Sequence, residues 1–361
     1  MIVVTERSPP GSPYTAPRTE RVAALPVCGD QSGRVPPGGR RPRSAPHTPG
    51  VPVISANGLL KRYGALVAVD GISFSVETGE IFGMLGPNGA GKTTTMEMLE
   101  GLREPDEGSA TVLGSDVVRE ARAIKTRIGV QLQATALPPL TRVREAIDLF
   151  GALFPTARST DDMLREFDLE SKATTYATEL SGGQMQRLSI ALALVNDPDV
   201  VFLDEPTTGL DPQARLNIWD VIEDVRRRGK TVVLTTHNME EAERLCSRIA
   251  VIDHGRIVAL GTPASLIAAH APGTTIEFDA PHGVDEEALA KIEGVDKVTV
   301  DARVAVSTRT PERVLRELLD PDAHWLRRGD DGQAAGIRDL RVRQGTLEDV
   351  FIALTGRSLR T

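Results

Sequence analysis

The stretch GPNGAGKTT, at residues 86–94, lies between a short apolar run and a run of helix-forming residues. The apolar run, 80–85, is typical of a buried β-strand, and the segment up to about residue 102 reads as a helix. A strand, a glycine-rich loop and a helix in this order are the context that a phosphate-binding loop requires. The stretch therefore predicts a phosphate site at the end of a strand.

Each residue type in this loop suits a different part of a nucleoside triphosphate. Gly86, Gly89 and Gly91 allow backbone N–H groups to converge on phosphate oxygens. Lys92 supplies a point charge for the β- and γ-phosphates, and Thr93 offers a hydroxyl to Mg²⁺. We therefore expect the phosphates of a nucleotide, with Mg²⁺, as the ligands.

A second stretch, DVVFLDEP at residues 199–206, ends an apolar strand on two adjacent carboxylates. In an open α/β sheet, ligands bind at the carboxyl ends of the strands. Asp204 would hold Mg²⁺ through water. Glu205 would then be placed to orient or deprotonate an attacking water.

A third stretch, LSGGQ at residues 180–184, precedes a helix. Ser181 is expected to cap this helix, so that its N-terminal N–H groups and its dipole face an anion. The simpler alternative is an ordinary helix cap after a glycine turn.

The rest of the central region alternates strands and helices, which predicts a parallel α/β sheet. The expected strands are 200–203 and 231–235, and the expected helices are about 213–227 and 239–246. Residues 142–196 read mostly as helix. His254-Gly255 lies between two apolar runs and favours a hairpin.

A linker is expected at Pro272-Gly273, and a smaller unit follows it. The expected elements are strand 275–279, helix 285–293, strand 295–301, strand 303–308, helix 311–319 and strand 337–343. This βαββαβ order favours a small α+β domain of the ferredoxin-like kind. Thr346 and Asp349 have the spacing of a capping box, which predicts a final helix from Thr346.

The composition is uneven along the 361 residues, whose length alone favours two domains. Residues 1–52 hold 11 of the 24 prolines, and their seven arginines and three acids leave a net charge of +4. Since the whole chain carries −8, the remainder carries −12. We expect a disordered, basic extension on an acidic body. The extension is either a solvated tail or the product of a start codon assigned too far upstream. The alternative is a segment that touches anionic lipid or a partner. That acidity argues against nucleic acid as the main partner.

Several protein classes are excluded by simple counts. Two cysteines, Cys28 and Cys246, cannot make a disulfide framework or a cysteine-rich zinc site. No apolar run approaches the roughly 18–20 residues of a membrane-spanning helix, and the N-terminus lacks a signal peptide. The expectation is a soluble intracellular protein that can dock on a membrane protein.

Taken together, the motifs resemble the nucleotide-binding domain of ATP-binding cassette (ABC) transporters. The matching parts, in the family's order, are GPNGAGKTT (86–94), LSGGQ (180–184), VVFLDEP (200–206), GLDP (209–212) and His237. The resemblance covers about 53–270. It implies a P-loop NTPase cassette with a RecA-like core, an antiparallel β subdomain and a helical subdomain, followed by an accessory domain at 273–356.

The resemblance also implies roles for single residues in catalysis. Gln133 matches the glutamine that touches Mg²⁺ and the attacking water and senses the membrane partner, with Gln131 as a nearby alternative. His237 would contact the γ-phosphate and steady Glu205. Thr93, Gln133 and Asp204 are thus the expected metal contacts.

Other residues match the family's nucleotide contacts. Tyr63 matches the aromatic residue that stacks on adenine, Asp211 would organise the dimer interface, and Ser181 and Gly183 would contact the γ-phosphate held by the opposite subunit. The further expected contacts with ATP are Pro87, Asn88, Ala90, Thr94 and Gln184.

By this resemblance, the phosphate loop and the LSGGQ stretch of one chain are halves of two different ATP sites. They imply a head-to-tail dimer, a homodimer in the simplest case, that closes around two ATP molecules. The segment 273–356 is similar to the C-terminal extension of exporter ATPases of the daunorubicin-resistance type, whose permease is a separate chain. The expected function is therefore ATP-driven export of an unknown drug, antibiotic or lipid-like cargo, at the cytoplasmic face of the cell membrane. The alternatives are a non-transport ABC ATPase and a regulatory module without catalysis.

Overall fold

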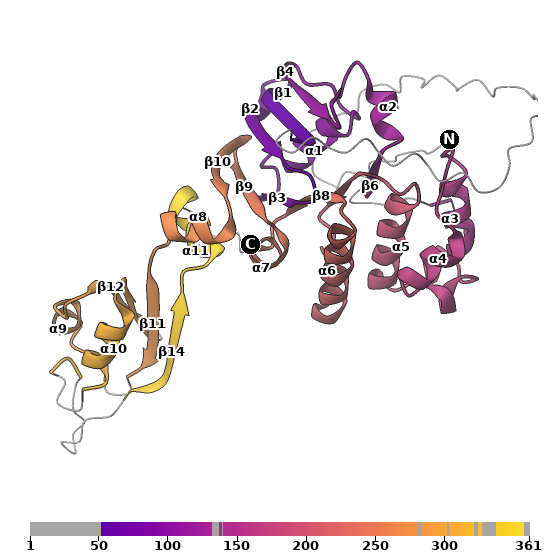
Figure 1. The fold of residues 1–361 in the computed structure, drawn as a ribbon. Helices are drawn as coiled ribbons and strands as arrows, with labels where there is room; N and C mark the ends of the chain where they lie inside the picture. Colours follow the sequence, from indigo (N-terminus) through magenta and orange to yellow (C-terminus); the bar gives the residue numbers. More distant parts are fainter. Residues whose placement is uncertain are drawn as a thin grey trace, which may run out of the picture.

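The computed structural model describes residues 52–131, 137–138, 140–280, 283–301, 303–320, 324–326 and 337–356. Three sheets organise this part of the chain. The first hydrophobic core cluster lies between a central sheet and the helices on one of its faces, and the second lies between the same sheet and an antiparallel sheet on the other face. The third cluster belongs to the third sheet. Figure 1 shows the first two sheets with their helices as one body, and the third sheet as a smaller body, two of whose own strands run toward the first body. The predicted α/β class is confirmed.

The six-stranded central sheet carries the phosphate loop. Its strands are β3 (Ile81–Leu85), β6 (Ile128–Gln131), β7 (Val200–Asp204), β8 (Thr231–Thr236), β9 (Arg248–Asp253) and β10 (Arg256–Gly261). Their order is β10-β9-β3-β8-β7-β6, and all neighbours except the β9–β10 hairpin are parallel. Strands β3, β7 and β8 are buried throughout, as strands covered on both faces of a parallel sheet should be. Their carboxyl ends therefore lie side by side.

A four-stranded antiparallel sheet covers part of the central sheet. Its strands are β1 (Ile54–Tyr63), β2 (Leu66–Val76), β4 (Glu107–Val112) and β5 (Ser115–Asp116), in the order β2-β1-β4-β5. The second core cluster joins this sheet to α1 (Lys92–Leu99), α2 (Ala121–Lys125) and the central sheet. Phe74 of β2 stacks on Phe82 of β3 with ring centroids 4.9 Å apart.

Helices cover the other side of the central sheet. They are α3 (Val143–Gly151), α4 (Thr160–Glu166), α5 (Gly182–Leu194), α6 (Pro212–Arg227) and α7 (Met239–Leu245), with short 3₁₀ turns at Glu170–Lys172 and Ala177–Glu179. The first core cluster joins them to the sheet. Within the described ranges, no helix is long and apolar enough to cross a membrane.

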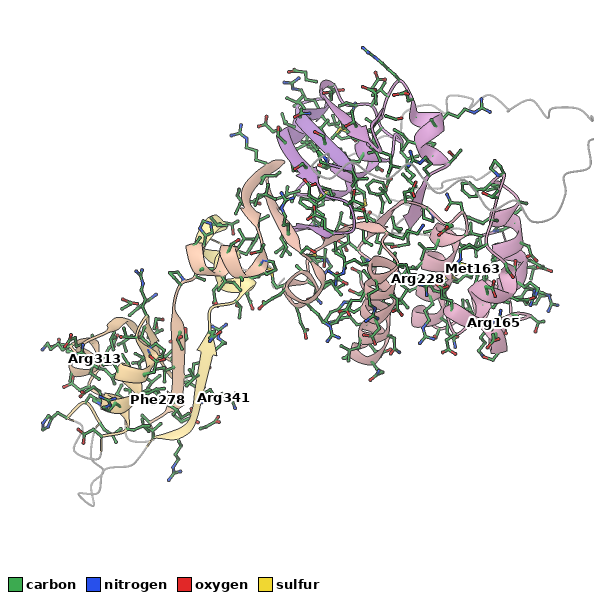
Figure 2. All side chains as sticks on the ribbon, viewed as in Figure 1. Met163, Arg165, Arg228, Phe278, Arg313 and Arg341 are labelled. Atoms are coloured by element: carbon green, nitrogen blue, oxygen red, sulfur yellow. The ribbon has the colours of Figure 1, made fainter. Side chains whose placement is uncertain are left out.

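The third sheet follows α8 (Pro263–His270). Its elements are β11 (Thr274–Asp279), α9 (Glu286–Ala290), β12 (Val295–Val300), β13 (Val304–Thr308), α10 (Pro311–Leu318) and β14 (Arg338–Gln344). The strands pair antiparallel in the order β12-β13-β11-β14. Phe278, labelled in Figure 2, packs against Trp325 in the core of this unit, with ring centroids 5.6 Å apart.

The last helix, α11 (Leu347–Thr355), does not stay with the third sheet. After β14 returns alongside β11, α11 packs against α8 and α7, and its Leu347, Val350 and Phe351 enter the first core cluster. The predicted capping box is confirmed, because Asp349 accepts a hydrogen bond from the Thr346 N–H at 2.9 Å and the Asp349 N–H donates to the Thr346 hydroxyl at 3.4 Å. The predicted domain boundaries, 1–52, 53–270 and 273–356, stay a prediction.

Candidate active site

The loop between β3 and α1 is held in shape from three sides. The Gly86 N–H donates to Thr236 O at 3.2 Å, which ties the loop to the end of β8. Glycine is required at two positions, because a Cβ on Gly86 would lie 2.2 Å from Ile252 O and one on Gly91 would lie 2.3 Å from Ala68 O. Gly91 also has φ 100°, in the left-handed region that favours glycine. The loop is therefore a rigid cradle before the first turn of α1.

Lys92, the first residue of α1, points back into this cradle and is only 4% exposed. Its Nζ donates to Gly86 O at 2.8 Å and to Pro87 O at 3.0 Å, and lies 3.6 Å from Glu205 Oε1. Burial lowers the pKa of Lys92, while the neighbouring Glu205 carboxylate favours the charged form. The loop carbonyls thus aim the ammonium group along the loop.

Asp204 ends β7 beside the start of α1. Its carboxylate accepts hydrogen bonds from the Thr93 hydroxyl, at 3.1 and 3.2 Å, and from the Thr235 hydroxyl. Burial raises the pKa of Asp204 and outweighs these two hydroxyls, which lower it. A hydroxyl and a carboxylate side by side are hard oxygen ligands of the kind Mg²⁺ prefers.

No cluster of three or more metal-binding side chains occurs in the part of the chain that the structure describes. This donor set fits Mg²⁺, because that ion is held in nucleotide sites by one or two protein oxygens together with waters and substrate phosphates.

Glu205 follows Asp204 in a strained conformation. Its φ is 49°, in a region that costs a non-glycine residue on the order of 1–3 kcal/mol. The Glu205 N–H donates to Thr235 O at 3.2 Å and to the Thr235 hydroxyl oxygen at 3.0 Å. The side chain accepts from the Thr208 hydroxyl at 2.9 Å, and His237 Nδ1 lies 3.2 Å from Glu205 Oε2.

This environment keeps Glu205 ionised. Burial raises the pKa of its carboxyl, but the hydrogen bond from Thr208, the neighbouring His237 and the charge of Lys92 together bring the pKa below its usual value. The structure therefore places an ionised carboxylate, with a histidine behind it, at the mouth of the phosphate loop.

The structure describes Tyr63 among the other predicted residues, but not Gln133. Tyr63 ends β1 and is 38% exposed, and the Arg103 guanidinium lies 5.2 Å from its ring centroid. Arg103 Nε in turn donates to Glu97 Oε2 at 2.6 Å. Gln133 lies outside the described residues, whereas Gln131 is buried at the end of β6.

The remaining loop residues divide by exposure. Asn88 and Gly89 form the exposed tip of the loop, and Thr94 is half-buried in α1. Ala90 is buried, and its carbonyl accepts a hydrogen bond from the Gly255 N–H at 3.0 Å. The predicted hairpin at His254-Gly255 is confirmed, and the hydrogen bond from its Gly255 N–H holds the phosphate loop at Ala90.

The LSGGQ stretch lies on a separate surface. Ser181 caps α5, as predicted, in a capping box with Gln184: the Ser181 N–H donates to Gln184 Oε1 at 3.1 Å and the Gln184 N–H to the Ser181 hydroxyl at 3.4 Å. Asp211 caps α6 and accepts from the Ala214 N–H at 2.9 Å. Gly183 faces Ala214, since a Cβ on Gly183 would lie 3.1 Å from the Ala214 Cβ.

A shallow groove of about 430 Å³ runs between these two helix ends. Its lining includes Ser181, Gly183, Gln184 and Asp211, and no residue of the phosphate loop. The structure thus brings Lys92, Asp204, Glu205 and His237 together and leaves the LSGGQ groove apart from them.

Two contacts of the site were missed by sequence reasoning. The hydroxyls of Thr208 and Thr235 both reach the Asp204–Glu205 pair. A signal was available only for Thr235, because it closes a buried strand that neighbours β7 at the same edge of the sheet.

Comparison with known proteins extends these observations. Residues 69–208 match the family model described as ABC transporter. The chain is 44% identical over 306 residues to the Nod factor export ATP-binding protein I of Paraburkholderia xenovorans, covering 83% of this chain and 96% of that protein. The protein of the same name from Ralstonia nicotianae is 43% identical over 324 residues, covering 87% of this chain and 98% of that protein.

Solved structures agree on the fold. The dimeric structure of MJ0796, a bacterial ABC transporter cassette, has a TM-score of 0.54 and 27% sequence identity, covering 58% of this chain and 98% of that chain. A structure titled as an ATP-binding subunit of an ABC transporter has a TM-score of 0.55 and 26% identity, covering 61% of this chain and 93% of that chain.

Proposed function

The chain belongs to the ABC transporter ATP-binding proteins and is an ATP hydrolase, and from this premise we propose that it drives export through a separate membrane permease. Support comes from its relatives, which are named for Nod factor export and match this chain over nearly their whole length. We assign it more finely to exporter ATPases of the daunorubicin-resistance type. Its cargo would be a drug, an antibiotic or a lipid-like molecule such as Nod factor, chosen by the permease.

In the proposed mechanism, the phosphate loop binds the triphosphate of ATP. The N–H groups of the loop and the start of α1 would face the phosphate oxygens, and Lys92 would move from the loop carbonyls toward the β- and γ-phosphates. Thr93, Asp204 and Gln133 would hold Mg²⁺, which would neutralise charge on the phosphates. Tyr63 would stack on adenine.

Glu205 would then activate the attacking water. Its carboxylate is ionised and lies 3.6 Å from Lys92 Nζ at the mouth of the loop, so it can accept a proton from a water in line with the γ-phosphate. His237, 3.2 Å away, would steady the carboxylate and contact the γ-phosphate. The strained backbone of Glu205 fits a residue whose direction matters more than its local stability.

Each chain would contribute two half-sites to a head-to-tail dimer. The groove of Ser181, Gly183 and Gln184 lacks phosphate-loop residues, so it would complete the site of a second chain, with Asp211 at the interface. The similar MJ0796 cassette has a dimeric structure, which supports this arrangement. A homodimer is the simplest form, docked through the segment near Gln133 on a permease at the cytoplasmic face of the membrane.

We also propose that the third sheet, with α9 and α10, is a ferredoxin-like accessory domain. Its βαββαβ order and its antiparallel strand order support this assignment.

One observation carries the catalytic proposal: the Glu205 carboxylate lies between Lys92 and His237. We expect Glu205→Gln to bind ATP with little change but to hydrolyse it about 10²–10⁴-fold more slowly, because the proton acceptor is lost. ATP binding by fluorescence titration and phosphate release by the purified protein measure the two effects. Glu287→Gln, at an exposed position of α9, is the matched control. Turnover by Glu205→Gln at the parent rate would contradict the assignment.

Export itself is tested with the permease. The chain should copurify with a co-expressed membrane permease encoded beside it, and ATP hydrolysis should rise when the cargo is added to the complex in liposomes. Hydrolysis that proceeds with no such partner, together with failure to copurify, would favour a non-transport ABC ATPase.

A further inference from the structure

Glu241 is a buried acid that the proposed mechanism does not use. It lies in the first turn of α7, four residues after His237, and is 1% exposed. Burying a carboxyl group costs free energy of folding unless hydrogen bonds from other groups compensate it, so the contacts of Glu241 set that cost.

The carboxylate is held by donors from separate elements. Glu241 Oε1 accepts hydrogen bonds from the Thr207 hydroxyl at 2.7 Å and from the Trp219 indole N–H, on α6, at 3.0 Å. Burial raises the pKa of Glu241, and the hydroxyls of Thr236 and Thr207 and the indole of Trp219 oppose that rise. Glu241 thus links α6 and α7 to the loop after β7.

Thr207 connects this group to the catalytic carboxylate. It lies two residues after Glu205, in the turn where the Thr208 N–H donates to Glu205 O at 3.2 Å and the Leu210 N–H to Thr207 O at 3.3 Å. Glu205 has a left-handed backbone, which persists only where surrounding contacts over-determine it. Thr235 restrains Glu205 on one side, and the hydrogen bond from Thr207 to Glu241 fixes the turn on the other.

His237, the second proposed catalytic group, lies just before the start of α7, the helix that carries Glu241. Thr236 precedes His237, and its hydroxyl accepts a hydrogen bond from the Asn238 N–H at 2.9 Å. Asn238 caps α7, its side chain accepting from the N–H groups of Glu240 at 3.0 Å and Glu241 at 3.3 Å. The start of α7, which carries Glu241, is therefore tied to the segment that carries His237.

We propose that Glu241 is a positioning residue for ATP hydrolysis, which acts through the Thr207 hydroxyl to hold the strained Glu205 turn in its reactive direction. The inference rests on the proposed role of Glu205. It predicts an effect on the chemical step and not on ATP binding, because the phosphate loop makes no use of the Thr207–Glu241 bond.

The test compares two donors to the same carboxylate oxygen. Thr207→Val keeps the shape of the side chain and removes the hydroxyl, and we expect kcat to fall about 10-fold or more with KM for ATP within about twofold. Thr207→Ser restores the hydroxyl and should return kcat to within about threefold of the parent. Trp219→Phe removes the other donor, which does not lead to Glu205, so it should lower the Tm while kcat stays within about twofold.

Three outcomes would overturn the proposal: an unchanged kcat in Thr207→Val, an equal loss in Thr207→Ser, or an equal loss in Trp219→Phe. The last result would mean that Glu241 only stabilises the fold. Glu241→Met supplies a further readout, since it removes the oxygen that accepts from Thr207 and should lower kcat as Thr207→Val does, and the double variant should lose little beyond either single one. Failure of the Glu205 assignment is recognised separately, by turnover in Glu205→Gln.

Discussion

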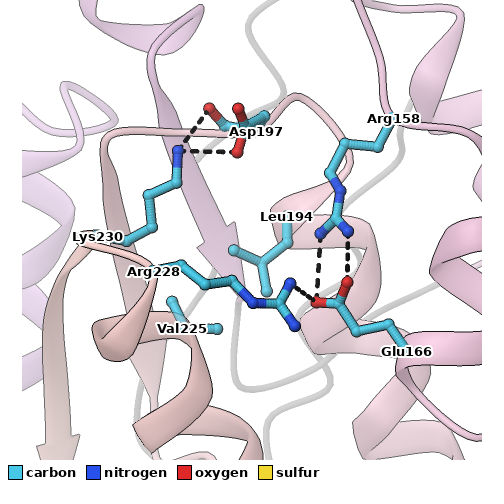
Figure 3. Close-up of a pocket in the computed structure, with 7 residues that line it drawn as sticks. All are labelled: Arg158, Glu166, Leu194, Asp197, Val225, Arg228 and Lys230. Atoms are coloured by element: carbon cyan, nitrogen blue, oxygen red, sulfur yellow. Dashed lines mark hydrogen bonds and ion pairs between the residues drawn. The ribbon is translucent and has the colours of Figure 1, made fainter.

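Ionic side chains gather at both edges of the central sheet, and the two groups differ in burial. At the carboxyl ends of β3, β7 and β8 lie Lys92, Asp204 and Glu205. Beside the amino ends of β7 and β8, a pocket of about 380 Å³ holds a second group, drawn in Figure 3. There Glu166 of α4 pairs with Arg158 and with Arg228 at the end of α6, and Lys230 lies 2.8 Å from Asp197.

The difference in exposure fits the role proposed for each group. The side chains of Lys92 and Glu205 are 4% and 8% exposed, whereas those of Arg228 and Asp197 are 45% and 65% exposed. Exposed pairs cost little to form and contribute about 0–1 kcal/mol. Buried charges carry a desolvation cost of several kcal/mol each, so they are weak contributors to stability. This burial fits the proposed role of Lys92 and Glu205 in binding and chemistry, whereas the exposed edge ties α4 to α6 through Glu166 and Arg228.

The largest test of this comparison replaces one lysine at each edge. Lys92→Met should lower kcat/KM for ATP by about 100-fold or more, because a charge aimed at the phosphates is lost. Lys230→Met should change it by less than about twofold, since Lys230 pairs with the exposed Asp197 side chain and its carbonyl. Steady-state hydrolysis measures both, with circular dichroism to check the fold. Similar losses in the two variants would remove the functional distinction between the edges.

Glu100 sharpens the comparison, because it is a buried acid outside both groups. It caps α1, is 2% exposed, and its Oε2 receives no hydrogen bond from any residue in the described ranges. Burial raises its pKa to about 8, and the nearby charges of Asp204 and Glu97 add to the rise. A carboxyl with a raised pKa stabilises the fold while protonated, and this contribution is lost as pH rises from about 4.5 through 8.

Glu100→Gln should therefore gain stability relative to the parent between pH 5 and pH 8. The expected change in relative free energy of unfolding is on the order of 3 kcal/mol, from linkage across that window. Urea unfolding of both proteins at the two pH values measures it. A constant difference between the two proteins across the window would show that Glu100 is not protonated in the folded state.

Glu166 gives the smallest expected effect. Burial raises the pKa of its carboxyl, but hydrogen bonds from Arg158 and Arg228 outweigh burial and leave the pKa below its usual value. Its stabilising contribution is therefore present above about pH 4.5 and lost as pH falls through the lowered pKa. Glu166→Gln should cost about 1 kcal/mol at pH 7, discounted for the partly exposed partners, with hydrolysis within about twofold.

Thermal unfolding at pH 7 and pH 3.5 tests this prediction, since the deficit of Glu166→Gln should shrink at the lower pH. Asp197→Asn, with a more exposed side chain, is the control and should change the Tm by less. A fall of 10-fold in hydrolysis by Glu166→Gln would show that the exposed edge also serves the reaction.

The sequence predicts best what is local along the chain. The phosphate loop, the cap of α5 by Ser181 and the hairpin at His254-Gly255 depend on residues close in sequence, so spacing alone indicates them. Glu205 could be placed at the end of a strand, but its left-handed backbone and the hydroxyls of Thr208 and Thr235 could not be foreseen. The Thr235 contact crosses strands that lie 30 residues apart.

The packing of the last helix was also beyond prediction. The apolar residues of α11 indicate a buried face, but they do not say which surface covers it. Only the pairing of β14 with β11 returns α11 to α7 and α8. A predicted βαββαβ unit followed by a helix is equally consistent with α11 packing on its own sheet.

That return gives the third sheet the topology of an insertion rather than of a tail. The chain leaves at Gly273 and comes back at Gly345, and the Gly345 N–H donates to Gly273 O at 2.9 Å. Residues 274–344 could thus be deleted and Gly273 joined to Gly345 with α11 still in place, because the two glycines already lie within hydrogen-bond distance of each other. A stop codon after Gly273 would instead remove Leu347, Val350 and Phe351 from the main core. For gene engineering, the two deletions are different operations, although both remove the same sheet.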